Sequence, residues 1–149
     1  IAYIKNKIPM AKKSAVCSYT SDGRKLIHTE LNINRSILKG LREQLPKSHS
    51  TEYYDCRISL FSAQKGKCAV SGEEFINVED IATWLKIPKE LGGYERYKNM
   101  ILIHKKYQSL LDKQPLSELK ALIKQLKTTK KMMIKINSMR EQAGMLAIE

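Results

Sequence analysis

Four polar side chains in the second half of the chain are of types that take part in hydrolysis: Asn99, His104, Gln108 and Asp112. A histidine can accept a proton near neutral pH, a carboxylate can hold a divalent cation, and an asparagine can hold a loop in place. Together with a metal ion, such groups could activate water for hydrolysis. The preceding stretch 82–85 (Ala-Thr-Trp-Leu) adds little, because tryptophan and leucine neither accept a proton at neutral pH nor bind a hard cation.

His104 has two interpretations. It precedes Gln108 by four residues on a predicted helix and could be a metal ligand, but a lone helix histidine is more often a surface or partly packed side chain. Cys68 has no Cys-x-x-Cys partner, because Ser71 stands in the third place after it. Structural zinc requires four N or S donors, and at most two can be assembled here. We therefore expect no metal and no other cofactor.

Trp84 also has two interpretations. The indole could fill volume in the core, or it could stack on a base of a bound nucleic acid. The apolar neighbours Ile81, Leu85 and Ile87 favour the core.

The charge of the chain indicates a polyanionic partner. Its 149 residues carry 27 Lys and Arg against 15 Asp and Glu, a formal net charge of +12. Residues 1–48 hold ten Lys or Arg against three acids, residues 49–92 hold five against seven, and residues 93–149 hold twelve against five. Two basic flanks thus bracket a mildly acidic centre, and nucleic acid is the expected partner. The alternative is that the lysines only form solvated helix faces.

Other features bear on location. The three cysteines, Cys17, Cys56 and Cys68, form no pair at metal-ligand spacing, and the N-terminus does not resemble a signal peptide, so we expect a reduced, cytoplasmic setting. No apolar run approaches the roughly 18 residues needed to span a bilayer, so no membrane partner is expected. Because the first residue is Ile1 and not Met, we expect a piece of a longer chain.

Helical periodicity is clearest in the first third of the chain. Residues 1–23 predict an extended basic arm that ends in a turn at 19–23 and leads into a helix. Asn34 is a suitable N-cap for the next helix, and Pro46 closes it. Its apolar face is formed by residues at helical spacing, namely Ile33, Ile37, Leu38, Leu41 and Leu45.

The pattern changes in the centre. Residues 47–56 are polar and predict a loop. The apolar positions of 56–70 favour short strands over helices, with tight turns at Lys65-Gly66-Lys67 and Ser71-Gly72. Whether such short apolar runs form strands or helices is decided by length and by flanking turn residues.

Two further apolar runs follow, and the chain ends in helical patterns. The runs cover 81–88 and 100–103, with Gly92-Gly93 between them, and the second leads into a helix through Tyr107 and Leu110. Pro115 suits the first turn of a helix, and a second helix follows it. Their apolar faces comprise Leu119, Leu122, Ile123 and Leu126 in the first and Met132, Ile136 and Met139 in the second. The whole pattern predicts an α+β, helix-rich fold.

Several blocks in order carry a family resemblance: Pro9-Met-Ala-Lys-Lys-Ser-Ala-Val-Cys17, Tyr19-Thr-Ser-Asp-Gly-Arg-Lys-Leu-Ile-His28, Arg57-Ile-Ser-Leu-Phe-Ser-Ala-Gln-Lys-Gly-Lys-Cys-Ala-Val70, Lys86-Ile-Pro88, Gly92-Gly93, Tyr97-Lys-Asn-Met-Ile-Leu102 and Arg140-Glu-Gln-Ala-Gly144. Over nearly its full length the chain resembles the C-terminal DNA-binding and HNH endonuclease region of bacterial group II intron-encoded reverse transcriptase/maturases. The resemblance implies an upstream polymerase and thumb domain, followed by a DNA-binding region and an endonuclease that nicks the target strand.

The resemblance also implies a division into three parts. Residues 1–50 would be a basic arm and DNA-binding helical region, 51–114 a degenerate ββα-metal (HNH-like) module, and 115–149 a C-terminal helical pair. The chain has no Tyr-x-Asp-Asp-like motif, so this piece is not expected to polymerise. The parent protein would be an RNA-directed DNA polymerase.

Departures from the HNH pattern weaken the expectation of cleavage. A His-x-His-His-type cluster is expected just before Lys86-Ile-Pro88, where this chain has 82–85, and the family's helical His-x-x-x-His corresponds to Gln108 and Asp112. Only Asn99 is retained, and His104 is nearby. We expect no catalytic residues here and treat these side chains as a remnant; Mg or Mn would be needed only if an altered site were active.

The favoured hypothesis is a nucleic-acid-binding region that holds target double-stranded DNA during intron retrohoming, in the bacterial cytoplasm and at the nucleoid when bound. Its other partners would be group II intron RNA and the upstream polymerase and thumb domain. The alternatives are an active metal-dependent endonuclease and an intron-RNA-binding maturase element. The predicted nucleic-acid contacts are Lys12, Lys13, Arg24, Lys25, Arg35, Lys39, Lys65, Lys67, Lys105 and Lys106.

Overall fold

The computed structural model describes residues 19–30, 33–44, 49–112 and 114–148. Its contacts divide the chain into two units, Ile1–Asn32 and Ile33–Glu149, which are treated separately. In the first unit the described element is helix α1 (Ser21–Glu30), whose start is capped by the Thr20 hydroxyl, which accepts from the Gly23 N–H at 3.0 Å. The predicted turn at 19–23 is therefore largely the first turn of a helix. The predicted arm before residue 19 lies outside the described residues.

The second unit begins with the amphipathic helix that the sequence predicts. Helix α2 (Arg35–Glu43) is capped by the Asn34 side chain, which accepts from the N–H groups of Ser36 and Ile37. Its apolar stripe is buried through Ile37, Leu38 and Leu41. The prediction for this helix is confirmed up to Glu43, and its expected last positions, Leu45 and Pro46, lie outside the described residues.

Helix α3 (Thr51–Ala63) corrects the prediction of a loop and short strands in the centre. The Ser50 hydroxyl accepts from the Tyr53 N–H at 3.2 Å and starts the helix. One face is buried through Cys56, Arg57, Leu60 and Phe61, a spacing of one turn. Helix α3 packs against α2, and its apolar run is too short for its period alone to distinguish a helix from a strand.

The predicted turns after α3 are confirmed, whereas strands between them are absent from this described stretch. Lys65 and Gly66 have positive φ angles of 53° and 67°, and Gly72 has a φ of 76°. An isolated bridge between Lys67 and Glu74 takes the place of the expected strands.

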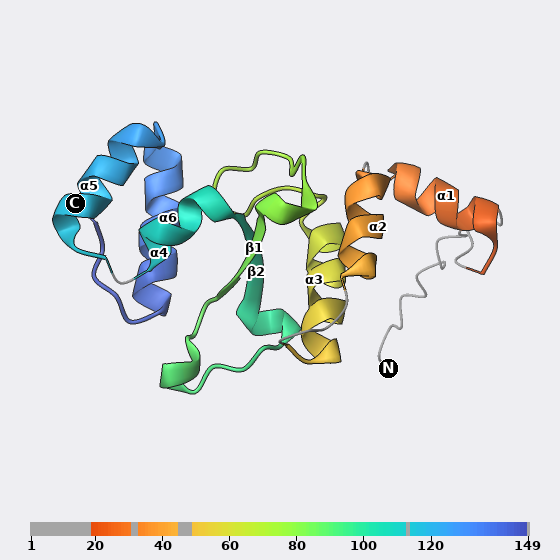
Figure 1. The fold of residues 1–149 in the computed structure, drawn as a ribbon, viewed down its shortest axis with the longest axis horizontal. Helices are drawn as coiled ribbons and strands as arrows, with labels where there is room; N and C mark the ends of the chain where they lie inside the picture. The colour runs from red at the N-terminus through yellow and green to blue at the C-terminus, as the bar shows by residue number, and fades with distance from the viewer. Residues whose placement is uncertain (1–18, 31–32, 45–48, 113, 149) are drawn as a thin grey trace, which may run out of the picture. The chain divides into compact units, whose positions relative to one another are not determined.

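The sheet consists of strands β1 (Ile81–Leu85) and β2 (Met100–His104), paired antiparallel with Ile81 opposite His104 and Leu85 opposite Met100. A short 3-10 helix, η1 (Val78–Asp80), leads into β1. Residues 86–99 connect the strands and contain η2 (Lys89–Leu91) and η3 (Tyr97–Asn99). Figure 1 shows these strands between α3 and the C-terminal helices, and α3 packs against β2.

The Gln64 side chain joins α3 to the free side of β2. Its amide nitrogen donates to the Leu102 carbonyl at 2.9 Å, and its oxygen accepts from the Leu102 N–H at 2.8 Å. The Ala69 N–H donates to the same carbonyl at 3.1 Å. Because β2 has β1 on one side only, these bonds satisfy polar groups that a longer sheet would pair with a third strand.

The C-terminal part of the chain contains the predicted pair of helices. After β2 come η4 (Lys105–Tyr107), α4 (Gln108–Leu111), α5 (Leu116–Gln125) and α6 (Lys130–Gln142). Helix α4 contacts both α5 and α6. The described residues thus form six α-helices and a two-stranded antiparallel sheet, which confirms the α+β class. None of the described helices has the length and apolar character required to cross a membrane.

Candidate functional site

The four residues predicted as a catalytic remnant do not converge. His104 is the last residue of β2, paired with Ile81, so its predicted place on a helix is wrong. Asn99 lies at the opposite end of that strand, immediately before it. Asp112 is the residue that ends α4, and burial raises the pKa of its carboxyl above the usual range. Within the described ranges, no three His, Cys, Asp or Glu side chains form a group that could hold a metal ion.

His104 is packed against apolar and sulfur groups. Its ring centre lies 5.5 Å from that of Phe75, and its backbone N–H donates to the Cys68 sulfur at 3.2 Å. Cys68 is buried. Cys68 therefore accepts a backbone hydrogen bond at the end of the sheet.

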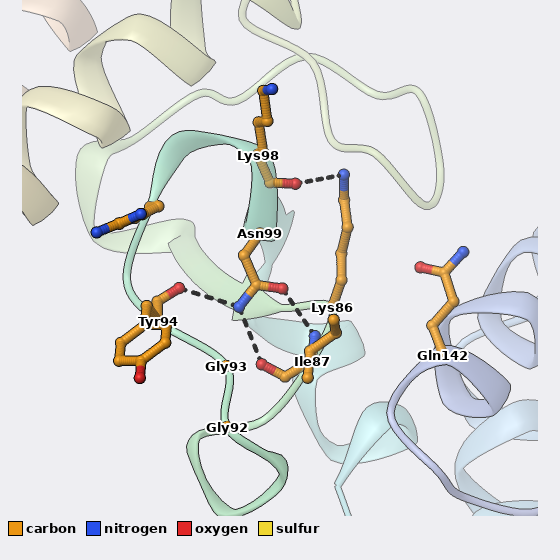
Figure 2. Close-up of a pocket in the computed structure, with 9 residues that line it drawn as sticks. Lys86, Ile87, Gly92, Gly93, Tyr94, Lys98, Asn99 and Gln142 are labelled. Atoms are coloured by element: carbon orange, nitrogen blue, oxygen red, sulfur yellow. Dashed lines mark hydrogen bonds between the residues drawn. The ribbon is translucent and has the colours of Figure 1, made fainter.

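Asn99 holds the connection 86–99 in one shape. Its side-chain oxygen accepts from the Ile87 N–H at 2.9 Å, and its amide nitrogen donates to the carbonyls of Ile87 and Tyr94, both at 3.0 Å. Figure 2 shows the amide lying between the two limbs of the connection. The Gly93 N–H adds a bond to the Pro88 carbonyl at 2.9 Å, and a Cβ at Gly93 would collide with the Ile87 carbonyl.

A cavity of about 490 Å³ opens beside Asn99. Its cationic side chains are Lys86, Arg96 and Lys98, and there is no carboxylate among the residues that line it. Tyr94, on its wall, is 72% exposed, and the Arg96 guanidinium lies 5.8 Å from the centre of that ring. The remaining lining residues are Ile87, Gly92, Gly93, Asn99 and, from α6, Gln142 (Figure 2).

The nearby acid Glu95 is neutralised within the same connection. The Lys89 ammonium lies 2.6 Å from its carboxylate and the His49 Nδ1 lies 3.1 Å from it. The hydrogen bond from Lys89 holds the pKa of Glu95 below its usual range, with His49 adding to the effect. Glu95 is only 16% exposed, and it lines an adjoining cavity of about 420 Å³ together with its partner Lys89.

A second, more polar cavity of about 410 Å³ lies between α3, β1 and η4. It brings together two regions that the sequence singled out, the β1 positions Ala82 and Thr83 and the helix position Gln108. Arg57, which sequence reasoning missed, is buried on its wall. The full lining consists of Gln44, Tyr53, Arg57, Val78, Glu79, Ile81, Ala82, Thr83, Lys105 and Gln108.

Trp84 is partly buried in β1, opposite Ile101. Its indole nitrogen is buried and has no hydrogen-bond acceptor among the described residues. Trp84 is not among the residues that line either of these two cavities.

The predicted nucleic-acid contacts are placed as follows. Lys12 and Lys13 lie outside the described residues, Arg24 and Lys25 lie on α1, Arg35 and Lys39 on α2, Lys65 and Lys67 in the turn after α3, and Lys105 and Lys106 on η4. Four of these lysines have carboxylate neighbours: Lys25 with Asp22, Lys39 with Glu43, Lys67 with Glu74 and Lys106 with Glu73. Such exposed pairs are weak and can exchange for phosphates.

The Lys106–Glu73 pair is the shortest of the four, at 2.8 Å. Its hydrogen bond raises the pKa of Lys106 and lowers that of Glu73. Lys105, by contrast, faces the polar cavity and has no ion-pair partner in the described part of the chain.

The cations of the 86–99 connection are also absent from the sequence-based set. A signal was present, because four cations, Lys86, Lys89, Arg96 and Lys98, alternate here with Tyr94 and Tyr97. The signal was lost because the charge was counted over 49–92 and 93–149, and the boundary between these two segments separates Lys86 and Lys89 from Arg96 and Lys98. Only the folded connection brings its two limbs to one cavity.

Comparison with known protein families, with curated proteins and with solved structures found no match for this chain.

Proposed function

We propose that this chain binds nucleic acid without cutting it, as the C-terminal region of a group II intron-type reverse transcriptase/maturase that holds target DNA. The observation that carries the proposal is the braced connection 86–99. It presents three cations and an exposed tyrosine around one cavity that no carboxylate lines. Cations supply phosphate contacts and an aromatic ring supplies a stacking surface, which is the combination that nucleic-acid-binding surfaces use.

The bracing of this connection supports recognition. A loop that is already ordered loses less conformational entropy when it binds. Asn99 supplies three hydrogen bonds to the connection, and Gly93 permits its two limbs to approach. The residues that carry these cations are therefore held in one ordered connection before a ligand arrives.

The order of elements supports the finer assignment to a degenerate HNH-like module. A hairpin with a long connection, β1 to β2, runs directly into η4 and α4, as a ββα-metal unit requires. The hydrogen bonds of the Asn99 side chain across the connection are in keeping with an asparagine that holds a loop in place. The β1 residues Thr83 and Trp84 and the helix residue Gln108 supply neither a general base nor a carboxylate or imidazole ligand, which favours binding over hydrolysis.

A charge-neutralising variant tests the proposal. Binding of the chain to a labelled DNA duplex is measured by fluorescence anisotropy at several salt concentrations. The triple variant Lys86→Gln, Arg96→Gln, Lys98→Gln is expected to bind at least tenfold more weakly, and the slope of log K against log salt should fall by about 2 to 3, at roughly 0.9 per phosphate contact.

The matched control removes the same charge elsewhere. It carries Lys120→Gln, Lys124→Gln and Lys131→Gln, three exposed lysines of α5 and α6. We expect a clearly smaller loss of affinity than in the connection variant. Equal losses would mean that diffuse charge drives binding and would refute a site at 86–99.

Two further measurements define the activity. Group II intron RNA replaces the duplex in the same assay, and tighter binding of RNA would favour the maturase alternative. Supercoiled plasmid is incubated with the chain and Mg²⁺ or Mn²⁺. Nicking that is lost in an Asn99→Ala variant would overturn the absence of cleavage and support the endonuclease alternative.

A further inference from the structure

Arg57 is a buried cation without a carboxylate partner. Its side chain is 8% exposed and forms no ion pair with any described carboxylate. Its two terminal nitrogens donate to the Gln44 side-chain oxygen at 2.6 Å and the Ile81 carbonyl at 3.4 Å, and its Nε is buried with no acceptor. The guanidinium also lies 5.9 Å from the centre of the Tyr53 ring. None of these contacts is with an anion, and a buried charge is costly unless it is paired and hydrogen-bonded, so an anion in the cavity would complete the environment of Arg57.

Arg140, the other buried arginine of the described residues, shows the contrast. It is 6% exposed and donates to the carbonyls of Leu146, Leu110 and Asp112 at 2.8 to 3.2 Å. Its contacts join α6 to the end of α4 and to the C-terminal segment. Arg140 is a structural residue, whereas Arg57 lines a cavity and its buried Nε has no acceptor among the described residues.

Several hydrogen-bond donors line the cavity beside Arg57. The Thr83 hydroxyl, on β1, is likewise buried and has no hydrogen-bond partner in the described part of the chain. Lys105 stands exposed on the cavity wall, and Tyr53 and Gln108 add a phenol and an amide. A guanidinium, an ammonium and a hydroxyl around one cavity match the charge and the several acceptor oxygens of a phosphoryl group.

We propose that this cavity binds one phosphoryl oxyanion, with Arg57 as its buried anchor and with Lys105 and Thr83 as further donors. The ligand would be a phosphate of the nucleic acid, so the inference rests on the proposed function, but it uses residues separate from the 86–99 connection. Glu79 is the one carboxylate among the lining residues, and its negative charge should repel an anion and weaken its binding. Removing the Glu79 charge should therefore raise the affinity of the cavity for an anion.

The first experiment uses inorganic phosphate with the whole chain. Nitrogen-proton NMR spectra are recorded during titration with phosphate, and with chloride and acetate at matched ionic strength. Phosphate should shift the side-chain Nε signal of Arg57 and the amide of Thr83 and raise Tm, with acetate much weaker. If neither signal moves and Tm is unchanged by phosphate beyond the chloride control, the proposal is overturned.

Two exposed residues that line the cavity, Lys105 and Glu79, allow the effect of charge on phosphate binding to be tested without changing a buried side chain. Lys105→Gln should weaken phosphate binding about 3- to 10-fold, and Glu79→Gln should tighten it about threefold, as expected for charges near the protein surface. Lys106→Gln is the matched control, because Lys106 is paired with Glu73 and does not line the cavity. Weaker binding in Glu79→Gln would show that no anion faces that carboxylate, and would refute the proposal.

Arg57 is tested with a variant that keeps its charge. Arg57→Lys removes the Nε donor and the fork geometry and should weaken phosphate binding at least tenfold. If this variant does not fold, the Lys105 and Glu79 variants still decide the question. Unchanged phosphate affinity in folded Arg57→Lys would refute the role of Arg57 as anchor.

The two sites can be separated with oligonucleotides. Duplexes with and without 5′-phosphates are compared on the Lys105→Gln variant. A loss confined to the phosphorylated duplex assigns the site to a terminal phosphate, and an equal loss assigns it to an internal phosphodiester. Phosphate shifts that persist in the connection variant support this cavity even if DNA binding fails, whereas DNA binding without phosphate shifts would refute the cavity alone.

Discussion

Replacing Asn99 with alanine tests how the connection between the strands is held. The substitution removes the three side-chain bonds to Ile87 and Tyr94. The backbone bond from the Lys86 N–H to the Asn99 carbonyl, at 2.9 Å, is independent of the side chain. We therefore expect the base of the hairpin to stay paired while the connection beyond Lys86 opens.

The size of the effect follows from the number of bonds and their exposure. A hydrogen bond contributes about 0.5–1.5 kcal/mol net, and these three lie at the surface, where water can replace the lost partner. We expect the free energy of unfolding to fall by about 1.5–2 kcal/mol. If binding requires the ordered connection, affinity for DNA should fall by roughly 10- to 30-fold, at 1.4 kcal/mol for each factor of ten.

Three measurements follow the variant: urea unfolding, hydrogen exchange at the Ile87 amide, and trypsin cleavage within 86–99. Exchange and cleavage should both accelerate. Asn77→Ala is the control, because the Asn77 side chain is exposed and donates one hydrogen bond, to the Asp80 carboxylate at 3.3 Å. Unchanged exchange at Ile87 together with wild-type cleavage would refute the bracing role of Asn99.

Two further predictions concern the same connection. Gly93→Ala should disrupt the connection, because the added Cβ would collide with the Ile87 carbonyl. Gly92→Ala has open space around the added Cβ and should lower the free energy of unfolding by only about 1–2 kcal/mol, because of its φ of 82°. Equal losses of unfolding free energy in the two variants would contradict this. Glu95→Gln should destabilise the fold by about 1 kcal/mol at neutral pH, because the hydrogen bond from Lys89 lowers the pKa of this carboxyl. That stability is present above the ordinary carboxyl pKa and is lost as the pH falls through the lowered one, so unfolding curves of the two proteins should converge in acid.

The sequence alone determined the elements whose signals lie within a turn or two. Helix α2 could be predicted because its cap, Asn34, and its buried positions are local. The helical pair α5 and α6 follows from periodicity and from Pro115 in the same way. The positive-φ turn at Lys65-Gly66 was also marked by its residue types.

Distant contacts decided the rest. The apolar run of α3 is too short for its period to distinguish helix from strand, and burial against α2 and β2 makes it a helix. His104 belongs to a strand because Ile81, far away in sequence, pairs with it. Arg57 illustrates the reason most clearly: no local pattern reveals that a cation will be buried, because its surroundings come from α2, β1 and η4, which only folding brings together.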